Sequence, residues 1–286
     1  MKTLLEICAG SLSSALVAEE GGADRIELCS ALPLDGLTPS HVAIEMAKKM
    51  LKIPVYVLIR PREGNFVYSP LEVALICADI RIAKYLGADG IVCGALDRDG
   101  NIDLRAMESF LEVSKGVSFT FHRAFDVCRD PFVAFRQLID LGVDTLLTSG
   151  QAATAQAGAG LIKSLIALAQ EDENWDKDED GGGHGNGDTD KDGGGGHGNG
   201  DADKDGDGGH GNGDADKDGG GHDNRYAAIT VMPGSGINAT NIAAIAMETG
   251  AKAIHLSARK RMDGGFDQTD VNEVRACREA LDALIR

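Results

Sequence analysis

The sequence has 286 residues with 28 basic and 45 acidic side chains, for a formal charge of −17. The acidity is local: residues 171–224 hold 18 acidic groups and four lysines, whereas the other 232 residues hold 27 acidic and 24 basic groups. A near-neutral body without a basic footprint argues against a nucleic-acid-binding protein. Because no apolar run of about 18 residues occurs, we expect no membrane span, and the N-terminal segment lacks the features of a signal peptide.

The cysteine pattern favours a reducing compartment. The six cysteines are widely spread and form no CxxC pair. In a chain of this size, that pattern predicts free thiols in a cytosolic protein rather than a disulfide scaffold.

Eight short runs rich in apolar and β-branched residues, each bounded by Gly, Pro, Asp or Ser, predict buried strands. They cover residues 3–8, 25–29, 54–62, 90–96, 118–125, 145–150, 228–232 and 253–257. Stretches with the apolar spacing of helices lie between them, including one over 159–170 and a last one over 271–285.

A short motif recurs where predicted helices lead into strands. It reads Gly22-Ala23-Asp24, Gly87-Ala88-Asp89, Gly142-Val143-Asp144 and Gly250-Ala251-Lys252, and glycine there accepts the left-handed conformation that ends a helix. Successive strand starts are 22, 29, 36, 28, 27, 83 and 25 residues apart, and without the 54-residue acidic segment the gap of 83 becomes 29. This regular βα repeat predicts a single (β/α)₈ TIM-barrel domain over residues 1–286. A doubly wound sheet is the alternative, but its GxGxxG fingerprint is absent.

The acidic segment 171–224 is of low complexity, with a repeat of 13 residues. It has too few apolar side chains to form a core, so we expect it to be disordered. Because it follows the sixth helix and precedes the seventh strand, it should lie on the face opposite the pocket. Its runs 188–193, 201–206 and 214–219 match the start of a calcium loop but lack the bidentate Glu, which predicts weak Ca²⁺ binding. A solvated spacer without a specific ion is the alternative.

The carboxyl ends of the predicted strands carry many polar residues, and in a TIM barrel these ends form the pocket. We therefore predict a ligand site there. Arginines can clamp a carboxylate or phosphate, and glycine-containing turns offer main-chain N–H groups to anions. The candidate ligand-binding residues are Arg60, Arg62, Arg123, Asp126, Ser149, Gly150, Gly234, Gly236 and Ser257, and the candidate acids or bases are Glu6, Glu27, His122 and His255.

Two carboxylate–thiol pairs share a spacing of two residues. Glu6 precedes Cys8 and Glu27 precedes Cys29 by that spacing, so each pair points to one face of its strand. If that face is inward, the two thiols converge, and two soft thiolates suit Cu(I). The alternative is that both cysteines are small buried hydrophobic residues.

Eight stretches of the sequence match the pattern of a known family: residues 6–8, 21–30, 37–40, 59–62, 120–126, 147–150, 232–234 and 255–259. On these stretches the chain resembles the CutC-like copper homeostasis proteins over nearly all residues outside the acidic segment. The resemblance implies a (β/α)₈ barrel that is cytosolic, commonly dimeric and linked to copper homeostasis, with Cu(I) bound at the cysteines corresponding to Cys8 and Cys29. Two positions depart from the family pattern, Asp35 and Ser235, and the acidic segment is foreign to it.

Two functions are compatible with the sequence. The first is a copper homeostasis protein that binds Cu(I) through Cys8 and Cys29. The second is an enzyme acting on a small anionic substrate, possibly phosphorylated, at the barrel mouth. The polar ring is richer than two thiolates require, which favours a small-molecule site, whereas no reaction is firmly attached to the family and fold alone does not decide.

Overall fold

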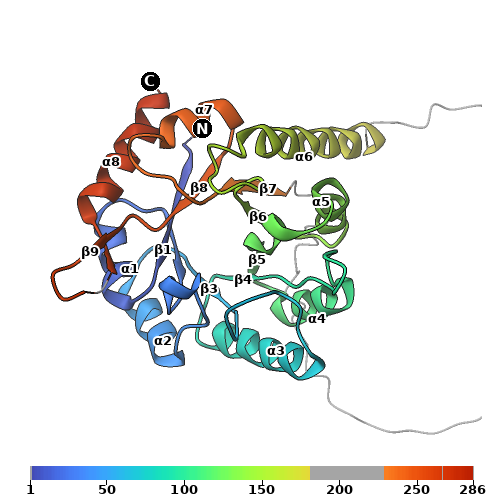
Figure 1. Ribbon diagram of the computed structural model, residues 1–286, viewed down its shortest axis with the longest axis horizontal. Coiled ribbons are helices and arrows are strands. Elements are labelled where there is room, and N and C mark those ends of the chain that lie inside the picture. Colours follow the sequence, from blue (N-terminus) through green and yellow to red (C-terminus); the bar gives the residue numbers. More distant parts are fainter. Residues whose placement is uncertain (1, 181–228, 266, 286) are drawn as a thin grey trace, which may run out of the picture.

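The computed structural model describes residues 2–180, 229–265 and 267–285. Within these ranges, eight parallel strands alternate with eight helices, and the helices surround the strands (Figure 1). The strand order is β7-β6-β5-β4-β3-β2-β1-β8. This arrangement confirms the predicted TIM barrel.

The strands that form the barrel are short. They are β1 (Leu4–Ala9), β2 (Arg25–Leu28), β3 (Val55–Leu58), β4 (Gly90–Cys93), β5 (Ser118–Phe121), β6 (Thr145–Thr148), β7 (Thr230–Pro233) and β8 (Ala253–Leu256). Several end before the predicted limit. Residues 59–62 and 94–96 lie outside the barrel strands, and residues beyond 122 form a short 3₁₀-helix, η2 (Arg123–Val127).

The helices follow the strands in the expected order. They are α1 (Leu12–Glu20), α2 (His41–Met50), α3 (Pro70–Tyr85), α4 (Leu104–Ser114), α5 (Pro131–Asp140), α6 (Ala159–Asp180), α7 (Ile242–Thr249) and α8 (Val271–Asp282). An antiparallel pair that the apolar pattern did not predict, β9 (Arg259–Arg261) and β10 (Asp267–Thr269), lies between β8 and α8. No helix in the described ranges is long and apolar enough to cross a membrane.

Strands β1 and β8 bring distant parts of the chain together. In the parallel register of β1, Glu6 lies beside Arg25 of β2 and beside His255 of β8. Inside the barrel, the Arg25 guanidinium lies 4.1 Å from the centre of the Tyr56 ring. A Cβ atom at Gly90 would lie 2.6 Å from that ring, so glycine there leaves the space that Tyr56 fills.

The joints between helices and strands confirm the predicted role of glycine and show an additional contact. All four joint glycines have positive φ values of 72–96°, which a side chain would disfavour. In three joints, the aspartate accepts a hydrogen bond of 2.7–2.9 Å from a main-chain N–H of a neighbouring strand: Asp24 from Leu5, Asp89 from Val55 and Asp144 from Phe119.

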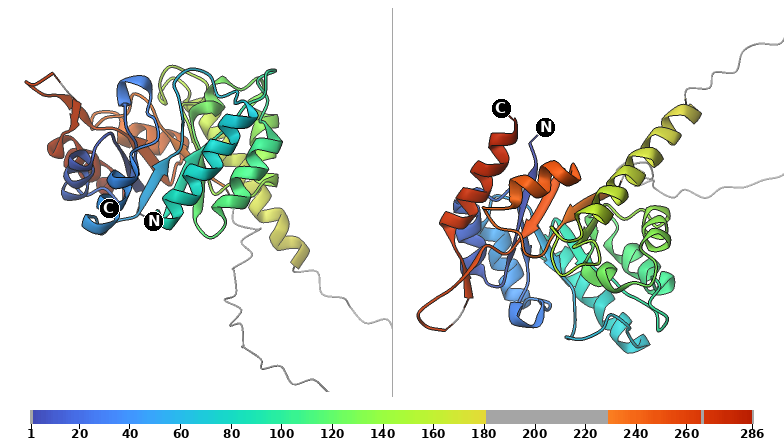
Figure 2. Two further views of the ribbon diagram at one scale, coloured as in Figure 1. Left: turned by 90° about the horizontal axis from the view of Figure 1, so that it is seen from below. Right: turned by 45° about the horizontal axis from the view of Figure 1, so that its top comes forward.

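Helix α6 is longer than the sequence pattern predicted. It continues to Asp180, ten residues beyond the predicted end at 170, and projects away from the barrel (Figure 2). Residues 171–180 include good helix formers and contain neither Gly nor Pro, so the backbone can continue as a helix. The predicted calcium-binding runs and the rest of the acidic segment lie outside the described residues.

Candidate functional site

A cavity of about 420 Å³ lies at the carboxyl ends of the barrel strands. Such a volume is in the range of small-molecule sites. It is lined by Cys8, Glu27, Leu32, Asp35, Leu58, Arg60, Gly64, Phe66, His122, Arg123, Asp126, Val127, Leu147, Ser235, Gly236, Ile237, His255, Leu256, Ser257 and Arg259. Its position agrees with the ligand site predicted from the polar strand ends.

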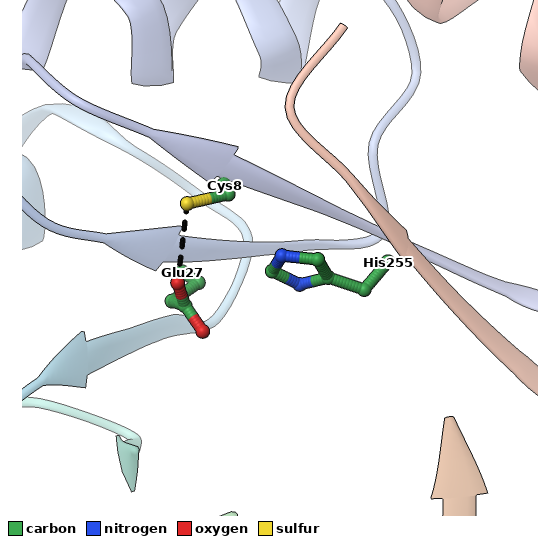
Figure 3. Close-up of side chains that lie close together, drawn as sticks. All are labelled: Cys8, Glu27 and His255. Carbon is green, nitrogen blue, oxygen red and sulfur yellow. Dashed lines mark hydrogen bonds between the residues drawn. The ribbon is translucent and has the colours of Figure 1, made fainter. Parts of the chain in front are cut away.

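Three potential metal ligands gather at the wall formed by β1, β2 and β8 (Figure 3). Ligand atoms of Cys8, Glu27 and His255 all lie within 4.8 Å of one another, and all three side chains are buried. The Cys8 Sγ donates a hydrogen bond of 3.1 Å to Glu27 Oε1 and lies 3.7 Å from the Cys29 Sγ. The two cysteines that the sequence singled out therefore meet, with a carboxylate and an imidazole beside Cys8.

Glu6 lies beside this cluster and holds His255 in place. One carboxylate oxygen lies 2.7 Å from His255 Nδ1, and the other accepts a hydrogen bond of 2.5 Å from Arg25 Nε. Burial alone would raise the pKa of Glu6, but the charge of Arg25 and the contact with His255 lower it below its usual value. Glu6 is therefore an ionised carboxylate that orients His255, and it is not among the residues lining the cavity.

Burial and neighbouring charges also set the protonation of the three clustered groups. The hydrogen bond with Cys29, burial and the charge of Glu27 raise the pKa of Cys8 well above its usual value. Burial raises the pKa of Glu27, and this effect exceeds the opposing effect of the charge on His255. Burial would lower the pKa of His255, but Glu27, Cys8 and Glu6 together raise it well above its usual value. Without a metal, Cys8 is thus a neutral thiol and His255 is cationic near neutral pH.

The structure brings most of the predicted site residues to the cavity. Glu27, His122, His255 and Cys8 line it, as do Arg60, Arg123, Asp126, Gly236 and Ser257. The others lie elsewhere. Glu6 and Cys29 lie against lining residues, and Arg62, Ser149, Gly150 and Gly234 are not among the lining residues.

Arg62 is held away from the cavity by its own loop. Its Nε donates to Glu72 at 2.5 Å, and its terminal nitrogens donate to the carbonyls of Glu63, Asn65 and Val67. Of the two arginines predicted to hold an anion together, only Arg60 therefore lines the cavity.

Asp126 organises the loop after β6. Its carboxylate accepts hydrogen bonds from Thr148 Oγ1 at 2.5 Å, from the main-chain N–H and hydroxyl of Ser149, and from Arg123 Nε at 2.8 Å. The Arg123 side chain is thereby positioned at the cavity edge. The Ser149 hydroxyl is engaged within this loop, because its single proton can be donated either to the Asp126 carboxylate or to the carbonyl of Ala152, which lies 2.7 Å away.

The predicted glycine turns have a packing role. A Cβ atom at Gly150 would lie 2.3 Å from the carbonyl oxygen of Gly158, and one at Gly236 would lie 2.7 Å from the Thr154 side chain. At Gly234 it would lie 2.7 Å from Leu147. Gly236 therefore lets the loop after β7 approach the loop after β6, Gly234 lets it approach strand β6, and Gly150 lets the loop after β6 fold back on itself.

Sequence reasoning missed two contributors to the site. The charge of Arg25 neutralises that of Glu6. Arg25 lies two residues before Glu27, and this spacing could have placed Arg25 on the same face of β2 as Glu27. Phe66 lies in the loop after β3, and its ring is 4.8 Å from the ring of His122. No periodic signal marks a residue in such a loop.

Known proteins resemble this chain over most of its length. The model of the CutC family matches residues 3–174. The family protein CutC of Bacteroides fragilis is 40% identical over 265 residues, which cover 92% of this chain and 83% of that protein. The human copper homeostasis protein cutC homolog is 37% identical over 263 residues, covering 92% of this chain and 76% of its own length.

The same relationship holds in three dimensions. The crystal structure of CutC from Streptococcus agalactiae superposes with a TM-score of 0.67 at 29% identity, covering 89% of this chain and 98% of that one. The sequence identity, the extent of the match and the shared barrel lead to one assignment: the chain belongs to the CutC family.

Proposed function

We propose that this protein takes part in copper homeostasis by binding Cu(I) at the paired thiols of Cys8 and Cys29. The observation that carries the proposal is the distance of 3.7 Å between the two sulfur atoms, where Cys8 lines the cavity and Cys29 lies directly against it. Metal–thiolate bonds of about 2.3 Å, as for zinc, allow one ion to contact both sulfurs. Thiolates are the ligands that Cu(I) prefers.

The surroundings of the thiol pair support a third ligand. His255 and Glu27 lie within 4.8 Å of the Cys8 sulfur. The contact between Glu6 and His255 Nδ1 leaves Nε2 as the other nitrogen that can bind a metal, and such carboxylate–histidine pairs orient metal ligands. His255 is therefore the proposed third ligand, with Glu6 as its positioning residue.

The protonation of the free site gives this proposal a pH signature. The pKa values of Cys8 and His255 are both raised well above their usual values. Both groups must lose a proton to bind a metal, so binding releases protons and strengthens as the pH rises. Calorimetry in buffers with different ionisation enthalpies measures the number of protons released.

Anaerobic titration with Cu(I) against a chromophoric chelator tests the site. We expect one ion per chain for the wild type and a loss of affinity of about 100-fold or more for the double variant Cys8→Ser/Cys29→Ser, because both thiolates are removed. Cys128→Ser is the control, since that buried cysteine is not among the cavity-lining residues. Equal affinity of the double variant and the control would contradict the proposal.

We also propose a cytosolic location and a homodimer, as the resemblance to the family implies. All six cysteines are free, which suits a reducing compartment. The measurements are subcellular fractionation and the molar mass of the protein in solution.

A second candidate function is an enzyme acting on a small anionic molecule. The observation that favours it is the cavity of about 420 Å³, which is far larger than an ion requires. Glu27 and His255 would then supply acid and base groups, and Arg60 would hold the anion. Native mass spectrometry of the purified protein separates the candidates: a bound organic molecule favours the enzyme, and copper alone favours the first proposal.

A further inference from the structure

Arg60 is a buried cation without an anionic partner in the described part of the chain. Its side chain lies at the cavity wall after β3, and the residue is only 4% exposed. Its guanidinium donates to the carbonyls of Leu34, Gly36 and Gly64 at 2.9–3.1 Å, and its Nε has no hydrogen-bond partner there. Carbonyl groups offset only part of the cost of burying a charge, so Arg60 would gain from a nearby anion.

His122 provides a neutral hydrogen-bond donor at the same wall. Its Nδ1 accepts a hydrogen bond of 3.3 Å from the main-chain N–H of Ala124. The ring proton therefore belongs on Nε2, which is buried and has no partner among the described residues. Burial and the charge of Arg60 lower the pKa of His122 to about 3, so the ring is neutral near pH 7.

Phe66 joins these two residues into one wall. The Arg60 guanidinium lies 5.0 Å from the centre of the Phe66 ring. The centres of the Phe66 and His122 rings are 4.8 Å apart. We call these three residues the Arg60–Phe66–His122 wall. It combines one positive charge, an aromatic surface and, on each of Arg60 and His122, a buried donor nitrogen without a partner in the described ranges.

The rest of the cavity sets the size and polarity of its occupant. Many other lining residues are apolar, so a bare inorganic ion would leave apolar surface exposed to water. An organic molecule would cover it. The other apolar lining residues are Leu32, Leu58, Val127, Leu147, Ile237 and Leu256.

We propose that the cavity binds a small organic oxyanion, a carboxylate or a phosphate monoester, with its charged group against the Arg60–Phe66–His122 wall and its body over the apolar lining. This inference extends the second candidate function. It rests on that function in one respect, that the cavity is a ligand site. It requires binding and not turnover. A purely structural Arg60, which holds the loops of residues 34–36 and 64 together, is the competing explanation.

Calorimetric titration of the full, metal-free chain tests this inference with benzoate and phenyl phosphate as oxyanion probes and benzyl alcohol as the neutral probe. At least one oxyanion should bind about tenfold or more tightly than benzyl alcohol, and the tighter of the two identifies the preferred charged group. Arg60→Gln should weaken that binding by about tenfold or more, and His122→Phe by several-fold. Arg136→Gln, the same charge change on the exposed face of α5, should alter it by less than about twofold.

A second measurement covers the case in which Arg60→Gln fails to fold. In the ¹⁵N spectrum of the wild type, the Arg60 Nε–H resonance should shift on addition of the oxyanion, whereas that of Arg136 should not. Absence of oxyanion binding, or binding that leaves Arg60 unshifted and survives Arg60→Gln, would overturn the inference. Neither measurement involves Cu(I) or turnover. This inference can therefore fail while the copper and enzyme proposals stand, and each of those can fail while this inference stands.

Discussion

His122 is a buried imidazole whose neutral state affects how the protein responds to acid. Its pKa is lowered to about 3 by burial and by Arg60, against about 6.5 in an unfolded chain. Between these values the unfolded state binds a proton that the folded state does not, so stability falls as the pH falls from 6.5.

His122→Gln should remove that part of the acid sensitivity. At about 1.4 kcal/mol per pH unit, the residue accounts for about 2 kcal/mol of unfolding free energy lost between pH 6.5 and 5. Urea unfolding at the two pH values measures the loss, with His41→Gln at the exposed start of α2 as the control. If His122→Gln loses as much stability as the wild type over this range, the buried neutral ring is not the cause.

Single residues of the site were predictable where one strand supplied the pattern. The spacing of two residues placed Glu6 with Cys8 and Glu27 with Cys29 on one face of each strand, and in the structure the side chains of Cys8 and Glu27 touch. The contact between Glu6 and His255 spans 249 positions and depends on β1 lying beside β8. Local periodicity holds no information about that register, so the role of Glu6 as the partner of His255 emerged only from the fold.

At the scale of elements, the aspartate in the repeated joint is a testable stabilising feature. Asp144 accepts a hydrogen bond of 2.7 Å from the main-chain N–H of Phe119. Asp144→Ala leaves that N–H without its acceptor and should cost about 1–3 kcal/mol of unfolding free energy. The fourth joint has Lys252 in the same position, so Lys252→Ala is a matched control with an expected change within about 0.5 kcal/mol. Equal changes in thermal or urea unfolding would show that the joint aspartate has no special role.

The elements themselves followed closely from the sequence, for a physical reason. Buried parallel strands are short apolar runs, and glycine marks the helix ends that precede them. The β9–β10 pair was missed because β9 is an exposed run of Arg, Lys and Arg without apolar alternation. The end of α6 was missed because the composition of 171–180 resembles a solvated segment, although its residues have good helix propensity.

For the whole molecule, the long α6–β7 connection should be separable from the site. Gln170 of α6 and Ile229 before β7 line the same small cavity, so a short linker can join them. Both positions lie toward the amino ends of the strands, whereas the large cavity lies at the carboxyl ends.

Replacing residues 171–228 by a short Gly/Ser linker should therefore leave ligand binding at the cavity unchanged and the melting temperature within about 4 °C, the shift for about 1 kcal/mol in a domain of this size. Differential scanning calorimetry and Cu(I) titration of both forms give the comparison. A loss of Cu(I) affinity on replacement would show that the connection contributes to the site.

We propose that this barrel binds Cu(I) at its cavity through two thiolates. X-ray absorption at the copper edge of the Cu(I)-loaded full chain tests it most directly, because sulfur and nitrogen or oxygen neighbours scatter differently. The account predicts two sulfur ligands and one nitrogen ligand per ion, and loss of one sulfur in Cys8→Ser. A first shell of nitrogen and oxygen alone, or one unchanged by Cys8→Ser, would contradict it.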